Sequence, residues 1–266
     1  MVKTQESLRL FSVLAVLMSL IMATFMALPV SAQTGQAGLS IAPPNTDLTV
    51  SGGEQVTRSL RVSNEGTGSV SVSMSANNFT ASGEEGGSSY LPRGTGGLAD
   101  WMTVTPGSFE LAGGSAREVT VVIDVPSNAS AGGHYASVFA YTSNGGEVTG
   151  SGAAVTTAIA ANFLLNVSGN VVEKASIAEF STPRSRLNAG EDVEFTIRIT
   201  NSGNTHITPT GVIEVYRKGV KVDELTLNEN GGAVLPNSTR QFSVSSEKAL
   251  LPGAYGAQAT VSYGSG

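Results

Sequence analysis

Few side chains in this sequence have the types and spacing that chemistry requires. The two histidines, His134 and His206, lie far apart and lack the H-x-H and H-E-x-x-H spacings of zinc ligands. Glu84 and Glu85 are adjacent carboxylates in a glycine-rich stretch, where a carboxyl is not buried enough for acid catalysis. We therefore expect a solvated loop tip at Glu84 and Glu85, and no catalytic residue, metal site or cofactor in the chain.

Aromatic side chains are the remaining candidates for a ligand site, because exposed rings can stack on sugars. The candidates are Tyr90, Trp101, His134 and Tyr141. The alternative for most of them is a place in the core, which is the more frequent location of a lone tryptophan that enters a strand. The sequence leaves these two interpretations open.

The N-terminus has the features of a secretory signal peptide. Lys3 and Arg9 precede an apolar run over residues 11–28, and Pro29 breaks that run. The small residues that follow predict cleavage after Ala32, with an uncleaved membrane anchor as the alternative. In both cases the rest of the chain is exported, and we expect it at a bacterial cell surface or outside the cell.

Composition excludes several classes of function. The chain has 15 basic and 21 acidic residues and a net charge of −6, with no cluster of lysine and arginine, which argues against nucleic acid or an anionic membrane surface as partner. It has no cysteine, so disulfides and thiolate metal sites are excluded. No P-loop and no G-x-S-x-G motif occurs. These features favour a non-enzymatic surface protein.

Period-two alternation of apolar residues indicates strands throughout the exported part. In residues 117–125, valine and isoleucine alternate with polar residues, and Pro126 ends the run. A glycine turn follows, and residues 134–141 then place aromatic side chains on one face and Ala136, Val138 and Ala140 on the other. This order is typical of an immunoglobulin-like β-sandwich.

Two glycine-rich stretches interrupt the strand pattern. Residues 77–97 predict a long loop that is either functional or disordered. A glycine-rich tongue begins at Asn144, and residues 155–167 form the last expected strand of this unit.

The second half of the chain repeats the first at an offset of 137 residues. The block 60–66 matches the block 197–203, and both contain an Asn-x-Gly turn, for which we expect a left-handed or tight backbone. Gly133-His134-Tyr135 corresponds to Gly253-Ala254-Tyr255. The prediction is an all-β protein with a signal peptide at 1–32 and two tandem immunoglobulin-like domains at 33–168 and 169–266.

The second unit ends one strand too early. The aromatic strand 255–263 is followed only by Gly264-Ser265-Gly266, so the second sandwich lacks its last strand. An open sheet edge is an aggregation hazard. Our hypothesis is that the chain continues beyond residue 266 or that a partner donates the strand.

The first unit resembles the N-terminal domain of the WxL-interacting protein family of bacterial surface proteins. The match covers residues 38–168, and the residues that carry it are Leu39–Pro44, Leu60–Asn64, Trp101–Pro106, Phe109, Leu111 and Gly132–Ala136. The resemblance implies a non-enzymatic surface protein whose first domain binds peptidoglycan and whose second domain binds a partner surface protein. It also implies a membrane anchor, which would lie beyond residue 266.

Three functions are compatible with the sequence. The first is a secreted or cell-surface scaffold that binds cell-wall glycan and another surface protein. The second is an extracytoplasmic chaperone or assembly factor that acts by β-strand complementation. The third is an accessory module of a longer secreted enzyme. Fold alone does not distinguish them.

Overall fold

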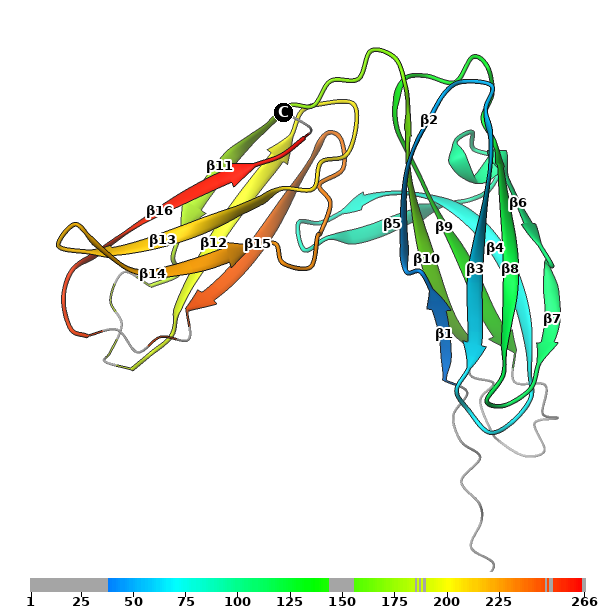
Figure 1. The fold of residues 1–266 in the computed structure, drawn as a ribbon, viewed down its shortest axis with the longest axis horizontal. Helices are drawn as coiled ribbons and strands as arrows, with labels where there is room; N and C mark the ends of the chain where they lie inside the picture. Colours follow the sequence, from blue (N-terminus) through cyan, green and yellow to red (C-terminus); the bar gives the residue numbers. More distant parts are fainter. Residues whose placement is uncertain are drawn as a thin grey trace, which may run out of the picture. The chain divides into compact units, whose positions relative to one another are not determined.

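The computed structural model describes residues 38–143, 156–184, 186, 188, 190–246, 248 and 251–264 (Figure 1). The predicted signal peptide, residues 1–32, and the glycine-rich tongue that begins at Asn144 lie outside the described residues. The described chain is built almost wholly of strands, which confirms the prediction of an all-β fold with immunoglobulin-like sandwiches.

The first sandwich packs a sheet in the order β1-β3-β8-β6 against a sheet in the order β2-β10-β9-β4-β5, with β7 also paired to β4. Its elements are β1 Leu39–Ala42, β2 Asn45–Val50, β3 Gln55–Asn64, β4 Val70–Ser82, β5 Gly87–Leu91, a 3-10 helix Leu98–Trp101, β6 Met102–Thr105, β7 Ser108–Leu111, β8 Ala116–Asp124, β9 Gly132–Ser143 and β10 Thr156–Val167.

The alternation read from the sequence places the core of this sandwich correctly. The inward side chains of β8 at Val119, Val121 and Ile123 are 0% exposed. They meet the small inward residues of β9, such as Ala136, which belong to the same buried cluster. The aromatic residues of β9 lie on the opposite face, as the sequence predicts.

The chain changes sheets at its first proline pair. β1 pairs with β3, and after Pro43-Pro44 the strand β2 pairs with β10 in the other sheet. The β2–β10 pairing is parallel and joins residues 45–50 to residues 162–167. β10, the last strand of the first sandwich, therefore pairs with β9 on one side and, over residues 162–167, with β2 on the other.

The prediction of a long loop over residues 77–97 is wrong. β4 continues to Ser82, and β5 returns beside it in a hairpin, shown in cyan in Figure 1. The glycine content hid the strand signal, while Phe79 and Tyr90 are cross-strand partners that stabilise the pair. The 3-10 helix follows the hairpin and buries Leu98.

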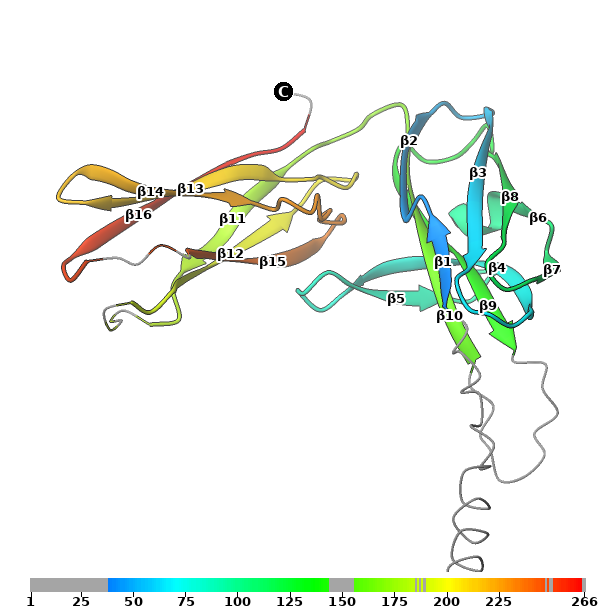
Figure 2. The same cartoon turned by 60° about the horizontal axis from the view of Figure 1, so that its bottom comes forward.

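The second sandwich has two sheets of three strands, in the orders β11-β12-β15 and β14-β13-β16. Figures 1 and 2 show β16 in red beside β13. Its strands are β11 Ala175–Ser181, β12 Val193–Asn201, β13 Thr210–Arg217, β14 Val220–Leu227, β15 Ser238–Ser246 and β16 Tyr255–Ser262.

The Asn-x-Gly repeat has a different physical cause from the one expected. Asn64 and Asn201 are buried, and each amide donates to two backbone carbonyls and accepts from the glycine N–H two residues later. Gly203 does not have a positive φ; a Cβ there would collide with the carbonyl oxygen of Val172. Both halves therefore use the asparagine as an internal brace, and the glycine permits close backbone approach.

Within the described part of the chain, no helix has the length and apolar character needed to span a bilayer.

Candidate functional site

The last strand of the second sandwich, β16, has one neighbour. It pairs antiparallel with β13 along its whole length, and no other strand of the described residues pairs with it. In the first sandwich the corresponding strand, β9, lies between β4 and β10. Among the described residues, the second sandwich therefore has no strand in the position that β10 occupies in the first.

The interior-facing side chains of β16 are only partly covered. Ala259 and Val261 are partly buried and alternate with the exposed residues Gln258 and Thr260. Phe180, on the facing edge strand β11, is also only partly buried. Apolar surface that a further strand would bury is therefore left accessible along β16.

The core of the second sandwich is divided as a result. Counted over the described residues, the first sandwich has one cluster of 24 buried hydrophobic residues, whereas the second has one cluster of six and another of three. Phe180, Val244 and Ala259 pack against both small clusters, and none of the three is fully buried. These residues lie between the two clusters and keep part of their apolar surface accessible.

The opposite edge of the same sheet is protected by charge. On β14, Lys221 donates to Glu224 at 2.6 Å and to Glu214 of β13 at 3.2 Å. These bonds raise the pKa of Lys221 to about 12. Lysine and other charged side chains on an edge strand prevent pairing with another chain. β16, with the sequence YGAQATVS, contains no charged residue.

A tyrosine fixes the end of β16 against the facing sheet. The Tyr263 hydroxyl donates to the Ala175 carbonyl at 3.1 Å and accepts from the Ala175 N–H at 3.0 Å. The two edge strands β11 and β16 are thereby held together at one end, and their uncovered residues lie beyond this contact.

A second feature lies on the outer face of the first sandwich. Five rings form a continuous chain of contacts, which we call the aromatic row: Phe79, Tyr90, Tyr135, Phe139 and Tyr141. The centroids of neighbouring rings are 4.9–6.3 Å apart. The predicted candidates Tyr90 and Tyr141 are in this row, joined through Phe139, and Tyr90 is 46% exposed.

The other two candidates form a separate pair. The Trp101 ring lies 4.6 Å from the His134 ring and is packed partly buried against the core cluster. His134 Nε2 lies 2.9 Å from the carbonyl oxygen of Ser130. This pair therefore fits a structural role better than a place in the aromatic row. The alternating rings on β9 were visible in the sequence, whereas the contribution of Phe79 was missed because its strand was read as a loop.

Glu84 is not the solvated loop tip that the sequence suggested. It lies in the turn of the β4–β5 hairpin and accepts two hydrogen bonds, each 2.6 Å long, from the guanidinium of Arg198 on β12. These bonds lower the pKa of the Glu84 carboxyl. Its backbone carbonyl also accepts from the Gln241 N–H at 2.7 Å. The carboxylate therefore links elements of the structure and has no catalytic partner.

His206 belongs to a small polar cluster. Its Nε2 lies 2.9 Å from Asp47 Oδ2, and its Nδ1 lies 3.4 Å from the Tyr135 hydroxyl. Burial raises the pKa of Tyr135. Among the described residues, no group of three His, Asp or Glu side chains could hold a metal ion.

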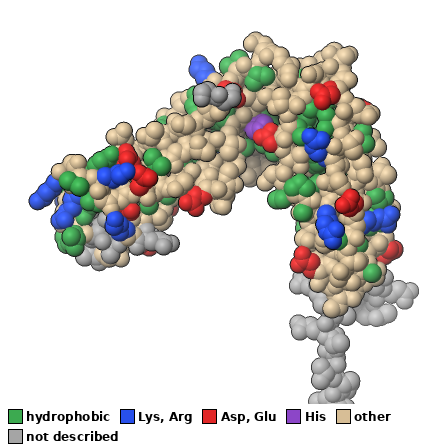
Figure 3. Space-filling view, viewed as in Figure 1, with side chains coloured by type: hydrophobic (Ala, Val, Ile, Leu, Met, Phe, Trp, Pro, Cys, Tyr) green, Lys and Arg blue, Asp and Glu red, His purple; other side chains and the backbone are tan. Residues whose placement is uncertain are grey.

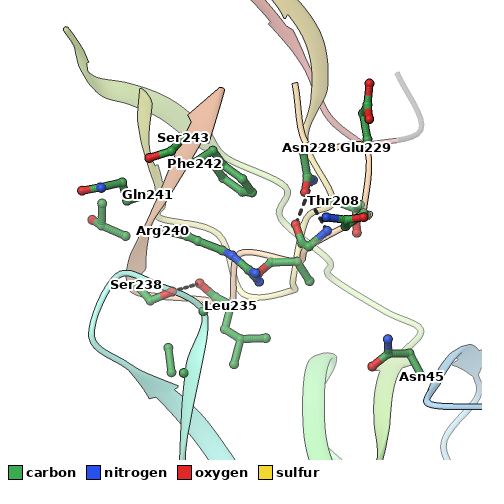
Figure 4. A pocket seen from close by; sticks show the side chains of 18 of the residues that line it. Asn45, Thr208, Asn228, Glu229, Leu235, Ser238, Arg240, Gln241, Phe242 and Ser243 are labelled. Carbon is green, nitrogen blue, oxygen red and sulfur yellow. Dashed lines mark hydrogen bonds between the residues drawn. The ribbon is translucent and has the colours of Figure 1, made fainter. Parts of the chain in front are cut away.

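A polar cavity of about 980 Å³ lies between the β4–β5 hairpin and the second sandwich. Figure 4 shows its amide and hydroxyl side chains, among them Asn45, Asn228 and Gln241, with Arg240 extending across the middle. Arg240 Nη1 donates to the Ala233 carbonyl at 2.9 Å, and burial lowers the pKa of the Arg240 guanidinium. The cavity offers hydrogen-bonding groups without a nucleophile and base at bonding distance.

Charge is distributed without a dominant sign on the face that Figure 3 presents. Basic and acidic side chains are interspersed over both sandwiches in that view. This distribution agrees with the composition, which argues against a nucleic-acid partner.

No protein-family model matches the chain, and no curated protein matches it. Solved structures do resemble it. The class 5 fimbriae chaperone CfaA is 14% identical with a TM-score of 0.45, over 84% of this chain and 98% of that one. A chain of the CsuC–CsuE chaperone–tip subunit complex of Acinetobacter baumannii is 14% identical with a TM-score of 0.41, over 77% of this chain and 90% of that one. The CupB2 chaperone of Pseudomonas aeruginosa is 10% identical with a TM-score of 0.40, over 84% of this chain and 98% of that one.

Proposed function

We propose that this protein is a non-enzymatic extracytoplasmic chaperone or assembly factor that binds another surface protein by β-strand complementation. The observation that carries the proposal is the unpaired, uncharged edge of β16, with partly covered apolar side chains beside it. The export expected from residues 1–32 would place this edge outside the cytoplasm.

The chemistry of an edge strand supports this activity. A free edge presents unpaired N–H and C=O groups that can form a ladder with an extended segment of another chain. Proteins that do not use such an edge normally block it with charges, as Lys221 does on β14. An exported chain that leaves one edge unblocked beside uncovered apolar residues is suited to receive a strand.

Two of the three similar structures are chaperones, and the third is a complex of a chaperone with a tip subunit. The activity proposed here is of that class, but its support comes from β16 itself. The resemblance to WxL-interacting proteins stays a prediction. If that resemblance holds, the partner of the second domain is another surface protein.

Blocking the edge tests the proposal. We expect Ala257→Lys to reduce the complex with the partner at least about tenfold. Ala257 is exposed on the same side of β16 as Ala259, so a lysine there would place a charge beside the apolar side chains of an added strand. The measurement is chemical crosslinking in intact cells followed by mass spectrometry of the captured proteins. Thr226→Lys, on the exposed face of β14, is the matched control. An unchanged complex in the Ala257→Lys variant contradicts the proposal.

The aromatic row favours glycan binding as a second candidate function. Its rings lie on the face of the sheet away from the core, beside hydroxyl and amide side chains such as Ser73 and Asn77. Rings supply stacking surface for a sugar, and neighbouring hydroxyl and amide groups can bond its hydroxyls. Cell-wall glycan is the ligand that the family resemblance suggests.

Retention on insoluble peptidoglycan tests this second function. We expect Tyr90→Ala to weaken retention about tenfold, because the Tyr90 ring is 46% exposed and its loss breaks the link to Phe139. Val220→Ala, which shortens an exposed apolar side chain of the second sandwich, is the control. Equal retention of both variants would count against glycan binding by the row.

A further inference from the structure

We infer that the strand received by β16 is an uncharged segment of a partner protein with large apolar side chains at alternate positions, running antiparallel to β16. Such a strand would complete the core of the second sandwich as β10 completes the first. This inference depends on the proposed function, because it specifies the partner of the same edge.

The first sandwich contains the template for the missing strand. β10 runs antiparallel to β9, and its inward residues Ala161, Phe163, Leu165 and Val167 are 0–1% exposed. β3, β8, β4 and β9 of the first sandwich correspond in pairing to β12, β15, β13 and β16 of the second. The edge that β10 covers on β9 is therefore the edge that is free on β16.

Large and small side chains are paired across this position in the first sandwich. Phe163 lies directly opposite Ala136 of β9. Directly opposite residues of an antiparallel pair point to the same face, so the large ring fills the space that the small residue leaves. On β16, Ala257 and Ala259 lie on one side of the strand and are likewise small, and Ala259 packs against the core clusters. A strand opposite them has room for large apolar side chains.

Those side chains would point toward the apolar residues that lie between the two core clusters. Phe180, Val244 and Ala259 each touch both buried clusters of the second sandwich and remain partly exposed. Apolar groups placed over Ala259 would contact Phe180 and join the two clusters into one. Backbone hydrogen bonds alone would leave the apolar surface of these residues exposed to solvent. The specificity for a partner therefore comes from the alternate side chains of its strand.

The edge also defines the charge and length of the donor. β16 has no charged residue along its eight positions, so a charged donor residue at the ladder would find no counterpart there. A donor that covers the strand therefore needs about eight residues without charge.

Hydrogen exchange with two synthetic peptides tests the inference. The first peptide carries residues 158–167 of this chain, AIAANFLLNV, with lysines added outside both ends for solubility. The second has serine in place of the phenylalanine and of the leucine that correspond to Phe163 and Leu165. We expect the first peptide to slow amide exchange in β16 and the second to bind at least about 100-fold more weakly, because two large apolar side chains are no longer buried. Protection should be absent from β14, the edge that Lys221 guards.

The possible results separate the inference from the proposed function. Equal binding of both peptides at β16 overturns the inference and leaves strand complementation standing. Binding of neither peptide also overturns it, while the Ala257→Lys crosslinking result still decides the proposed function. If the β16 amides that point away from β13 are already protected in the free protein, the edge is covered by another occupant. If the protein is then a dimer in solution, the occupant of the edge is a second copy of the chain. If it is a monomer, the occupant is another segment of the same chain.

Discussion

Replacing Asn201 by alanine should lower the free energy of unfolding of the second sandwich by about 3 kcal/mol, since three buried backbone groups lose their hydrogen-bond partner. Asn201 is 0% exposed; its amide donates to the Thr205 and Val234 carbonyls, and its oxygen accepts from the Gly203 N–H. For a domain of this size the midpoint of thermal unfolding would fall by roughly 10–20 °C. Differential scanning calorimetry measures the shift.

The exposed residue Asn230 supplies the control within the same sandwich. Asn230→Ala removes the same chemical group at an exposed position, and we expect the midpoint to change by no more than about 2 °C. Asn64→Ala should reproduce the large effect in the first sandwich, where Asn64 makes the equivalent bonds. A small effect of Asn201→Ala, similar to that of Asn230→Ala, would show that water replaces the lost bonds and that the asparagine is not a brace.

Replacing Phe163 by alanine should destabilise the first sandwich by about 3–5 kcal/mol, because the ring is fully buried and the cavity left behind cannot be filled by its small neighbour Ala136. Trp101 is the only tryptophan in the chain and packs against the same core cluster. Its fluorescence during urea denaturation therefore reports the unfolding of this sandwich.

Leu164→Ala is the matched control, since Leu164 is the next residue of β10, points away from the core and is only partly buried. We expect it to cost less than half as much as Phe163→Ala. Equal losses from the two variants would mean that the last strand does not complete the core. That result would also remove the template for the strand that we infer at β16.

The sequence predicted those features that depend on local periodicity and on comparison of the two halves. The inward residues of β8 and β9 followed from alternation alone, because side chains on a strand change sides at every residue. The single neighbour of β16 among the described strands agrees with the repeat, in which only the first unit has a strand after its aromatic strand. The residues of the aromatic row on β9 were also on the predicted face.

Features that depend on contacts between distant segments were not predictable from local pattern. Glycine-rich composition concealed the β4–β5 hairpin, and the partner of Glu84 is Arg198, more than one hundred residues away. The matching of Tyr255 with Tyr135 was correct in order but wrong in face. Tyr255 packs against a core cluster, whereas Tyr135 contacts Phe79 on the outer face. A shift of one residue between repeats reverses the side of every side chain.

The parallel pairing of β2 with β10 has a mechanical consequence. β2 follows β1 at the start of the first sandwich, and β10 is its last strand in the chain. Tension between the two would pull parallel strands from opposite ends. The hydrogen bonds between residues 45–50 and 162–167 run across the direction of the strands, so they would be loaded together in shear and not opened one by one. The first sandwich is therefore built to carry load along the line between its entry and exit strands.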